Sequence, residues 1–69
     1  MSEHVYKKIE ITGTSKESSD QAVRNAIEKA AETVKNIDWF ELIETRGQVV
    51  DGELKFWQVT VKLGFRLEA

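Results

Sequence analysis

Residues 36–47, with the sequence Asn-Ile-Asp-Trp-Phe-Glu-Leu-Ile-Glu-Thr-Arg-Gly, organise the rest of the chain. The stretch is expected to hold the end of a helix, the start of a strand and the first of two tryptophans, Trp39. An Arg46-Gly47 pair is expected where that strand stops. Apolar and polar residues alternate only loosely, so the strand is expected to bury side chains on both faces. The residues before this stretch indicate a strand and a helix, and those after it indicate a long returning strand.

An amphipathic helix is expected to lead into this stretch from Ser18. Ser18 and Gln21 match a Ser-x-x-Gln capping box. The helix is expected to run for about five turns, with Lys35 in its last turn and Asn36 in the left-handed position that ends it. Its narrow apolar face, rich in alanine so that a sheet can approach closely, consists of Ala22, Val23, Ala26, Ile27, Ala30, Val34 and Ile37.

Residues 5–12 are expected to form the first strand, because their apolar and polar side chains alternate, and residues 13–17 a loop by composition. One face of the strand carries Val5, Ile9 and Ile11. The other carries Tyr6, Lys8, Glu10 and Thr12.

A hairpin joins the other two strands, because Asp51-Gly52 is a strong signal for a two-residue turn. This turn pairs residues 50 and 53 and, farther along, Thr45 with Gln58 and Trp39 with Gly64. Trp39 and Gln58 then share the face away from the helix, beside a glycine that leaves room for the indole. Trp57, together with Phe40 and Leu42, is expected on the helix side.

This register also puts Arg46 on the helix side, apart from Trp39. A bulge at Gly47 would turn Arg46 back towards Trp39. Alternatively, its long side chain reaches across an interface between subunits.

The elements together predict an α+β fold with the chain order β-α-β-β. A right-handed crossover makes the first two strands parallel, so the third strand lies between them and runs antiparallel to both. The predicted three-stranded antiparallel sheet has the order 2-3-1 and curls around one amphipathic helix. Residues 1–69 are expected to form a single domain.

The composition limits the functional classes. The 69 residues include no cysteine and one histidine, so disulfides and a thiolate metal site are excluded. A core this small rarely supplies more than about 3–5 kcal/mol, so an oligomer is expected. The net charge of −2, with 32% charged residues of both signs, argues against nucleic-acid binding. No apolar run approaches the roughly 18 residues of a membrane span, and no signal peptide is evident, so a cytoplasmic location is expected.

No set of residues indicates an enzyme. No serine has a credible base nearby in the pattern, and Gly13-Thr14-Ser15 lacks the spacing and lysine of a phosphate-binding loop. The carboxylates of Glu10, Glu41 and Glu44 are interpreted as solvated or salt-bridged groups.

A more informative set is Trp39, Gln58 and Gly64, with Arg46 and Arg66 nearby. An indole stacks on flat heteroaromatic rings, a carboxamide matches the edge of a uracil-like ring, and arginine pairs with phosphate. The alternative is a structural oligomer or interaction module in which Trp39 only fills a subunit interface. On the residues alone, the interface interpretation is the favoured one.

Several segments together resemble the dodecins, and the resemblance runs nearly end to end. They are Lys7–Ser15, Ile37–Glu41, Arg46-Gly47, Gln58–Val61 and Gly64–Glu68. Dodecins are small flavin-binding proteins that assemble as hollow dodecamers of cubic symmetry, each subunit a β-α-β-β unit. The resemblance implies a homododecamer in which two flavins stack between symmetry-related copies of Trp39.

The resemblance also implies roles for the other site residues. Gln58 would bind the edge of the isoalloxazine, and Arg46, with Arg66 and Tyr6, would serve the ribityl phosphate. The expected cofactor is FMN, with riboflavin, FAD and coenzyme A as other ligands. The implied function is flavin storage and buffering with quenching of photoexcited flavin, without turnover.

Overall fold

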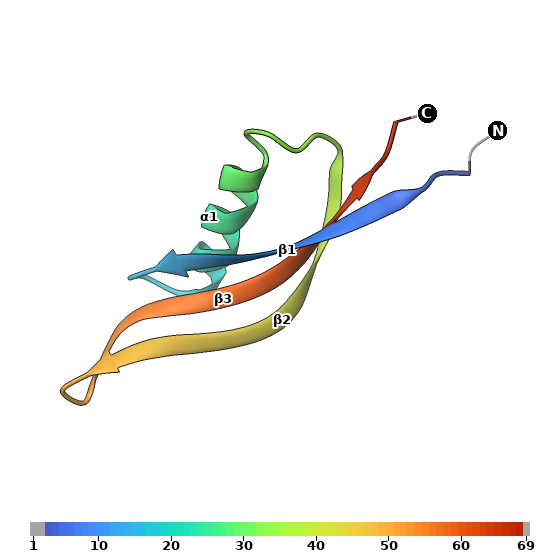
Figure 1. Ribbon diagram of the computed structural model, residues 1–69. Coiled ribbons are helices and arrows are strands. Elements are labelled where there is room, and N and C mark those ends of the chain that lie inside the picture. The colour runs from blue at the N-terminus through green and yellow to red at the C-terminus, as the bar shows by residue number, and fades with distance from the viewer. Residues whose placement is uncertain (1–2, 69) are drawn as a thin grey trace.

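The computed structural model describes residues 3–68. The chain forms β1 (Tyr6–Ser15), α1 (Ser19–Ala30), β2 (Ile37–Val50) and β3 (Glu53–Arg66), in that order. The three strands form one antiparallel sheet with β3 in the middle and α1 against one face (Figure 1). This confirms the predicted α+β fold and its strand order.

The helix begins as predicted but ends early. Ser18 is its N-cap, and the Ser18 Oγ accepts a hydrogen bond of 3.0 Å from the backbone N–H of Gln21. The Gln21 side chain donates to Asn25 instead of reaching back, so only half of the capping box forms. The helix has 12 residues and ends at Ala30, so the expectation of about five turns was wrong.

Asn36 adopts the predicted left-handed conformation, with a φ of 66°, but it lies well beyond the helix end. Its carbonyl accepts a hydrogen bond of 3.1 Å from the Arg66 N–H, and its side chain amide lies 3.4 Å from the Arg66 carbonyl. Asn36 therefore starts the sheet pairing of β2. Between the helix and β2, the backbone N–H groups of residues 31–34 bond back to the carbonyls of Ile27, Lys29 and Ala30, so these residues form turns at the end of the helix.

Strand β1 extends through residues 13–15, which were wrongly expected to be a loop. Gly13 is buried against α1, where an added Cβ would lie 2.1 Å from the Ala22 carbonyl oxygen and 2.8 Å from the Ala26 Cβ. A glycine facing two small helical residues lets the helix backbone approach the strand. The strand ends at Ser15, whose hydroxyl accepts a hydrogen bond of 2.9 Å from the N–H of Glu17.

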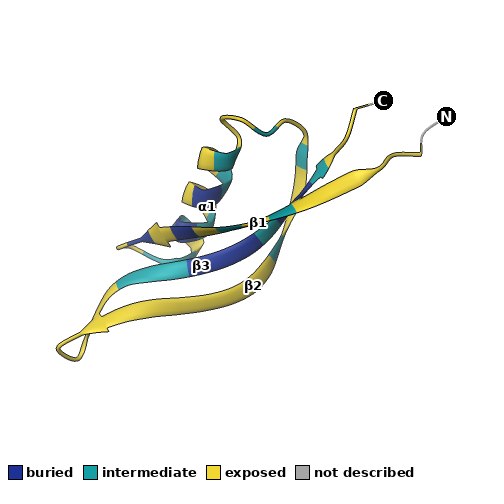
Figure 2. Ribbon diagram, viewed as in Figure 1, coloured by how far each residue is buried: buried dark blue, intermediate teal, exposed yellow. Residues whose placement is uncertain are grey.

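The core lies between α1 and the middle of the sheet (Figure 2). Its buried members are Ala22, Ala26, Val59, Val61 and Leu63. Ile9, Ile11 and Trp57 pack against them and are partly buried. These contacts confirm the predicted helix-facing side of the third strand and the core position of Trp57. Ile9 and Ile11 share one face of the first strand as predicted, whereas Val5, expected on the same face, is 67% exposed. Figure 2 also shows that β2 is exposed along most of its length.

The hairpin turn is confirmed, since Asp51 and Gly52 have φ values of 52° and 78°. Val50 pairs with Glu53, but the register then shifts between Gln48 and Val49 and shifts back between Leu42 and Glu44. As a result Trp39 pairs with Gly64 as predicted. The predicted pairing of Thr45 with Gln58 was wrong.

The two register shifts decide where Arg46 lies. Between them Arg46 pairs with Gln58, and cross-strand partners share a face. Arg46 therefore lies on the face away from α1, so its place in the simple register was wrong. The alternative, a bulge that turns Arg46 back, is correct in kind, but the shift lies between Gln48 and Val49 and not at Gly47. Strand β2 also continues past Gly47 to Val50, so the expectation that it stops at Arg46-Gly47 was wrong.

Replacing Gly52 by valine should destabilise the protein by about 1–2 kcal/mol, the typical cost of a left-handed backbone for an ordinary residue. Within the part of the chain that the structure describes, no atom lies within 4 Å of the position that a Cβ would take, so the cost comes from the backbone alone. Urea unfolding measures it. Gly52→Asn is the control and should cost much less, because asparagine tolerates this conformation. Equal losses in both variants would contradict the backbone explanation.

Among residues 3–68, no helix has both the length and the apolar character needed to cross a membrane.

Candidate functional site

The sheet face opposite α1 carries an indole lying over a glycine. A Cβ added to Gly64 would lie 2.2 Å from both Cε2 and Cζ2 of Trp39, so the ring fills the space that a side chain would need. Even so, 37% of the Trp39 surface is exposed. A large aromatic ring therefore rests on the sheet and remains open to a partner.

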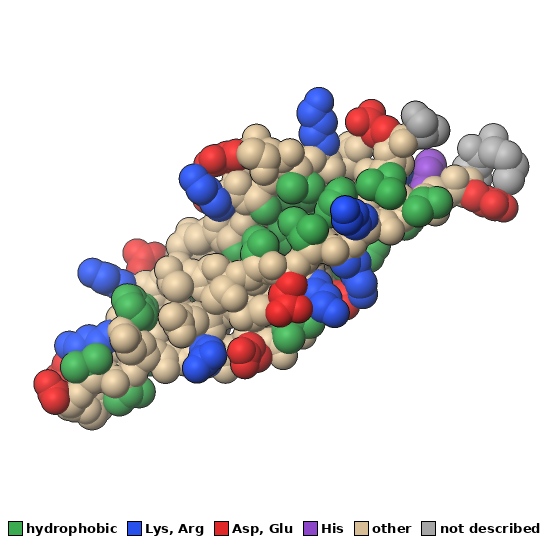
Figure 3. Space-filling view, in the orientation of Figure 1, with side chains coloured by type: hydrophobic (Ala, Val, Ile, Leu, Met, Phe, Trp, Pro, Cys, Tyr) green, Lys and Arg blue, Asp and Glu red, His purple; other side chains and the backbone are tan. Residues whose placement is uncertain are grey.

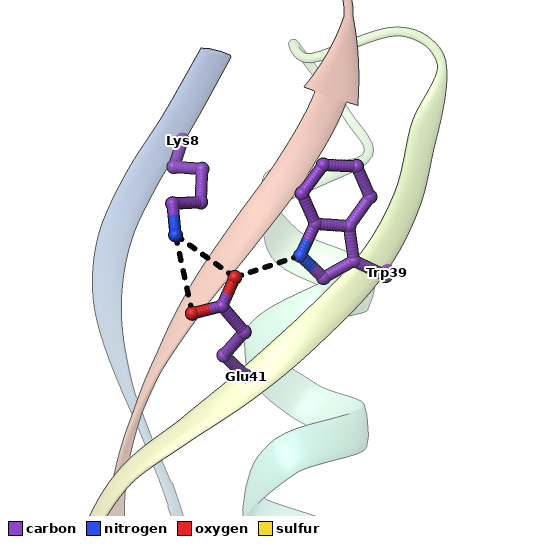
Figure 4. A network of polar contacts seen from close by, with 3 residues as sticks. All are labelled: Lys8, Trp39 and Glu41. Atoms are coloured by element: carbon purple, nitrogen blue, oxygen red, sulfur yellow. Dashed lines mark hydrogen bonds and ion pairs between the residues drawn. The ribbon is translucent and has the colours of Figure 1, made fainter. Parts of the chain in front are cut away.

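Polar contacts hold this indole at its N–H edge (Figure 4). The Trp39 Nε1–H donates a hydrogen bond of 2.9 Å to Oε2 of Glu41. The Lys8 ammonium donates to both oxygens of the same carboxylate, at 3.2 Å to Oε1 and 2.9 Å to Oε2. Lys8 comes from β1 and the other two residues from β2, so the contacts reach across the central strand.

A second aromatic ring contacts Trp39 from β1. The ring centroids of Tyr6 and Trp39 are 5.2 Å apart with an interplanar angle of 63°, which is an edge-to-face arrangement. Arg66 pairs with Tyr6 across β1 and β3. Trp39, Tyr6 and Arg66 therefore gather at one end of the sheet, and we call them the ring cluster.

The remaining two predicted site residues lie elsewhere. Gln58 and Arg46 are paired neighbours on the same face, and we call them the polar cluster. The Arg46 Nη1 lies 3.8 Å from Oε2 of Glu44, and both side chains are largely exposed. At about 3.4 Å per residue along β3, the polar cluster lies roughly 20 Å from Gly64. One protomer thus carries the predicted site residues as two separate groups.

The contacts with Trp39 and Lys8 change the pKa of the Glu41 carboxyl group. The hydrogen bond from the Trp39 N–H, followed by that from Lys8, lowers the pKa of Glu41 below its usual value of 4.5. The charges of Lys8 and Lys62 add to this effect. Glu41 is therefore negatively charged at neutral pH and accepts the indole N–H as an anion.

The sequence predicted no contact of Lys8 or Glu41 with Trp39, and Glu41 was interpreted as a solvated or salt-bridged carboxylate. The interpretation of Glu41 as a salt-bridged carboxylate is correct, but its bond to Trp39 was missed. The sequence spacing could have predicted this bond, because Glu41 lies two residues after Trp39 and therefore on the same face of the strand. Lys8 was placed on the polar face of the first strand, opposite Ile9 and Ile11, but its position relative to Trp39 was not predicted.

The helix side of β2 carries an open groove of about 440 Å³ between this strand and α1. Phe40 and Leu42 line it as predicted, together with Val23 and Ile27 of the helix. Because α1 packs mainly on β1 and β3, Phe40 and Leu42 remain 49% and 59% exposed. The protomer thus leaves part of its apolar surface uncovered.

The described charged side chains on one face of the molecule do not gather in a region of one sign. On the face shown in Figure 3, lysines and arginines alternate with aspartates and glutamates along the whole length of the molecule. Among residues 3–68 there is also no group of three or more histidine, aspartate or glutamate side chains able to hold a metal ion. On the sheet face opposite α1, the partly exposed ring of Trp39, which we call the aromatic platform, is the feature that most clearly offers a contact to a ligand.

The fold and this platform define a small binding protein built on a three-stranded sheet. Comparison with known proteins identifies the family. The family model described as Dodecin matches residues 5–68. The dodecin of Thermus thermophilus is 44% identical over 64 residues, which cover 93% of each chain.

Solved structures agree with this match. The dodecin from Streptomyces davaonensis has 53% sequence identity and a TM-score of 0.94, and the alignment covers 99% of this chain and 100% of that one. For the dodecin from Streptomyces coelicolor the identity is 52%, the TM-score 0.93 and the coverage 100% and 99%. The chain therefore belongs to the dodecin family, as its sequence segments predicted. The family consists of small, generally oligomeric proteins that bind flavins or other small ligands.

Proposed function

We propose that this protein stores and buffers FMN, which stacks on Trp39. The observation that carries the proposal is the indole held over Gly64 with part of its surface open. Stacking on an aromatic side chain contributes about 1–3 kcal/mol per base for flat nucleic-acid bases, and the isoalloxazine ring is also flat and heteroaromatic. The membership in a family of flavin or small-ligand binders supports the same ligand class.

The separation of the two clusters supports a site shared between subunits. A ring stacked on Trp39 does not extend the roughly 20 Å to the polar cluster of the same protomer. We infer that Gln58 and Arg46 come from a neighbouring copy, with Gln58 at the isoalloxazine edge and Arg46 at the phosphate. Arg66 and Tyr6, next to Trp39, are assigned to the ribityl phosphate as well. Two flavins would then stack between symmetry-related copies of Trp39.

The shape of the protomer supports a large assembly, which we propose is a homododecamer. Its radius of gyration is 14.4 Å, against about 11 Å for a compact chain of this length. The protomer extends 56 Å along its longest axis but only 13 Å along its shortest. Among residues 3–68, ten large hydrophobic side chains, Phe40 and Leu42 among them, are exposed in one protomer. Contacts with other copies would bury this surface.

We place this role in the cytoplasm and assign it to residues 1–69 as one domain. An electron-rich indole touching an electron-poor flavin is expected to quench photoexcited flavin by electron transfer. The protein would therefore hold FMN in a dark, unreactive form and release it by mass action, without turnover. FMN is preferred over riboflavin in this proposal because an arginine is assigned to its phosphate.

The test is extraction of the bound ligand from the purified protein, identified by mass spectrometry. The apoprotein is then titrated with FMN, riboflavin and FAD while flavin fluorescence is followed. We expect FMN in the extract and strong quenching on binding, with static light scattering showing a large assembly. Coenzyme A in place of a flavin, or no quenching at micromolar protein, would contradict the proposal.

A further inference from the structure

The indole of Trp39 is held from three directions within one protomer. Gly64 lies beneath the ring, and the Tyr6 ring meets it edge-to-face with the ring centroids 5.2 Å apart. Oε2 of Glu41 accepts a hydrogen bond of 2.9 Å from the indole Nε1–H. Lys8 binds both oxygens of the Glu41 carboxylate. We call Lys8 and Glu41 the indole clamp.

The clamp selects one ring orientation for a physical reason. The torsion that turns an indole about its last rotatable bond is broad and has two roughly equivalent positions. Turning the Trp39 ring over would move its N–H away from Glu41 and leave that hydrogen bond unmade. Because the acceptor is a carboxylate that Lys8 also holds, the bond to the indole is of the stronger, charge-assisted kind.

The clamp also joins the edges of the sheet. Trp39 and Glu41 lie on β2 and Lys8 on β1, with Gly64 of β3 between them. The absence of a side chain at Gly64 lets the ring lie flat enough for these contacts. The orientation of the ring is therefore set by all three strands before any ligand arrives.

We propose that Glu41 and Lys8 are positioning residues of the flavin site, which fix Trp39 over Gly64 and present its ring for stacking. This inference rests on the proposed flavin-binding function and adds two residues to the site. Holding the ring in advance avoids the loss of side-chain freedom that ligand binding would otherwise have to overcome.

The charge of Glu41 makes the clamp dependent on pH. The charged groups around it are Lys8 from β1 and Lys62 from β3, and Glu10 of β1 is the cross-strand neighbour of Lys62. Because the pKa of Glu41 lies below 4.5, the clamp is complete at neutral pH. It weakens only when the pH falls through that lowered pKa. The helix α1 contributes nothing here, since it lies on the other face of the sheet.

The first experiment needs no flavin. The chain contains two tryptophans, so ¹⁵N labelling of the indoles gives two N–H signals, which Trp39→Phe assigns. At neutral pH, Glu41→Gln and Lys8→Met should shift the Trp39 signal and speed its exchange with water, with Trp57 unchanged. On acidification, the wild-type Trp39 signal should titrate with a midpoint below 4.5, and that of Glu41→Gln should not.

Glu53→Gln and Lys55→Met are the matched controls. Glu53 and Lys55 form an exposed ion pair at 3.1 Å near the hairpin turn, so these variants remove the same charges far from Trp39. A Trp39 signal that is the same in the clamp variants and in the controls would overturn the inference.

The second experiment measures FMN affinity in the assembled protein. Glu41→Gln and Lys8→Met should weaken binding roughly threefold to tenfold. Lys8→Arg, which preserves a charged two-pronged partner, should restore it, and the two controls should bind as wild type. Unchanged affinity in both clamp variants would overturn the positioning role while leaving the proposed function intact. A wild-type protein that binds no FMN would instead overturn the proposed function, whatever the indole signals show.

Discussion

Gly13→Ala is expected to destabilise the protein by about 1–3 kcal/mol or more, a large share of what so small a core supplies. The added methyl carbon would lie 2.1 Å from the Ala22 carbonyl oxygen and 2.8 Å from the Ala26 Cβ. Neither group can rotate away, since one belongs to the helix backbone and the other is attached directly to it. The helix would have to move off the sheet, and the contacts of Ala22 and Ala26 with the core would be lost.

Urea unfolding at a fixed protomer concentration measures this effect, because the stability of an oligomer depends on concentration. Gly47→Ala is the matched control. A Cβ there would lie 2.5 Å from Cδ1 of Leu54, which is the end of a flexible and half-exposed side chain. We expect the control to lose much less stability than Gly13→Ala. Similar losses in the two variants would show that close packing of α1 on β1 is not the cause.

Trp39→Ala is expected to weaken FMN binding by about 1–3 kcal/mol for each lost stacking partner, or roughly fivefold to more than a hundredfold. Quenching of the remaining bound flavin should also be lost, because the indole is the proposed electron donor. Gln58→Ala should weaken binding less, since water can replace part of the hydrogen bonding at the ring edge. Flavin fluorescence titrations of both variants measure these effects.

Trp57→Phe is the control for Trp39→Ala. Trp57 lies on the core side of the sheet and should not affect FMN affinity. Size-exclusion chromatography of each variant separates the two interpretations of Trp39. An intact assembly with weakened FMN binding supports the storage site. An assembly that dissociates in Trp39→Ala, or one that binds FMN as tightly as wild type, would favour the interface interpretation.

Some features of the fold depended only on neighbouring residues and could be predicted from the sequence. Ser18 caps the helix through a bond to a residue three positions away, and Asp51-Gly52 forms the turn through its own backbone preference. The strict alternation of β3 placed Trp57 on the core side. Together with the turn, it also placed Trp39 opposite Gly64. The resemblance of several segments to one family carried the identification, which no single motif would have done.

Other features depended on residues far apart in the chain. The helix pattern continued to Ile37, but the chain leaves the helix after Ala30, and Asn36 already pairs with Arg66 at the end of β3. Residues 13–15 have the composition of a loop, and they form a strand because they pair with β3 beneath the helix. In both cases long-range pairing overrode a local preference.

The arrangement of the site shows the same division. The sequence by itself determined which residue types are present and that Trp39 and Gln58 share a face. Only the tertiary structure decided that Arg46 pairs with Gln58. One register shift lies between Arg46 and the hairpin turn, and a second, of opposite effect, restores the original register before Trp39. It alone also brought Lys8 to Glu41, 33 residues away in the chain. Alternation within a strand is a local property, whereas a bulge or a contact between β1 and β2 depends on how separate strands are aligned.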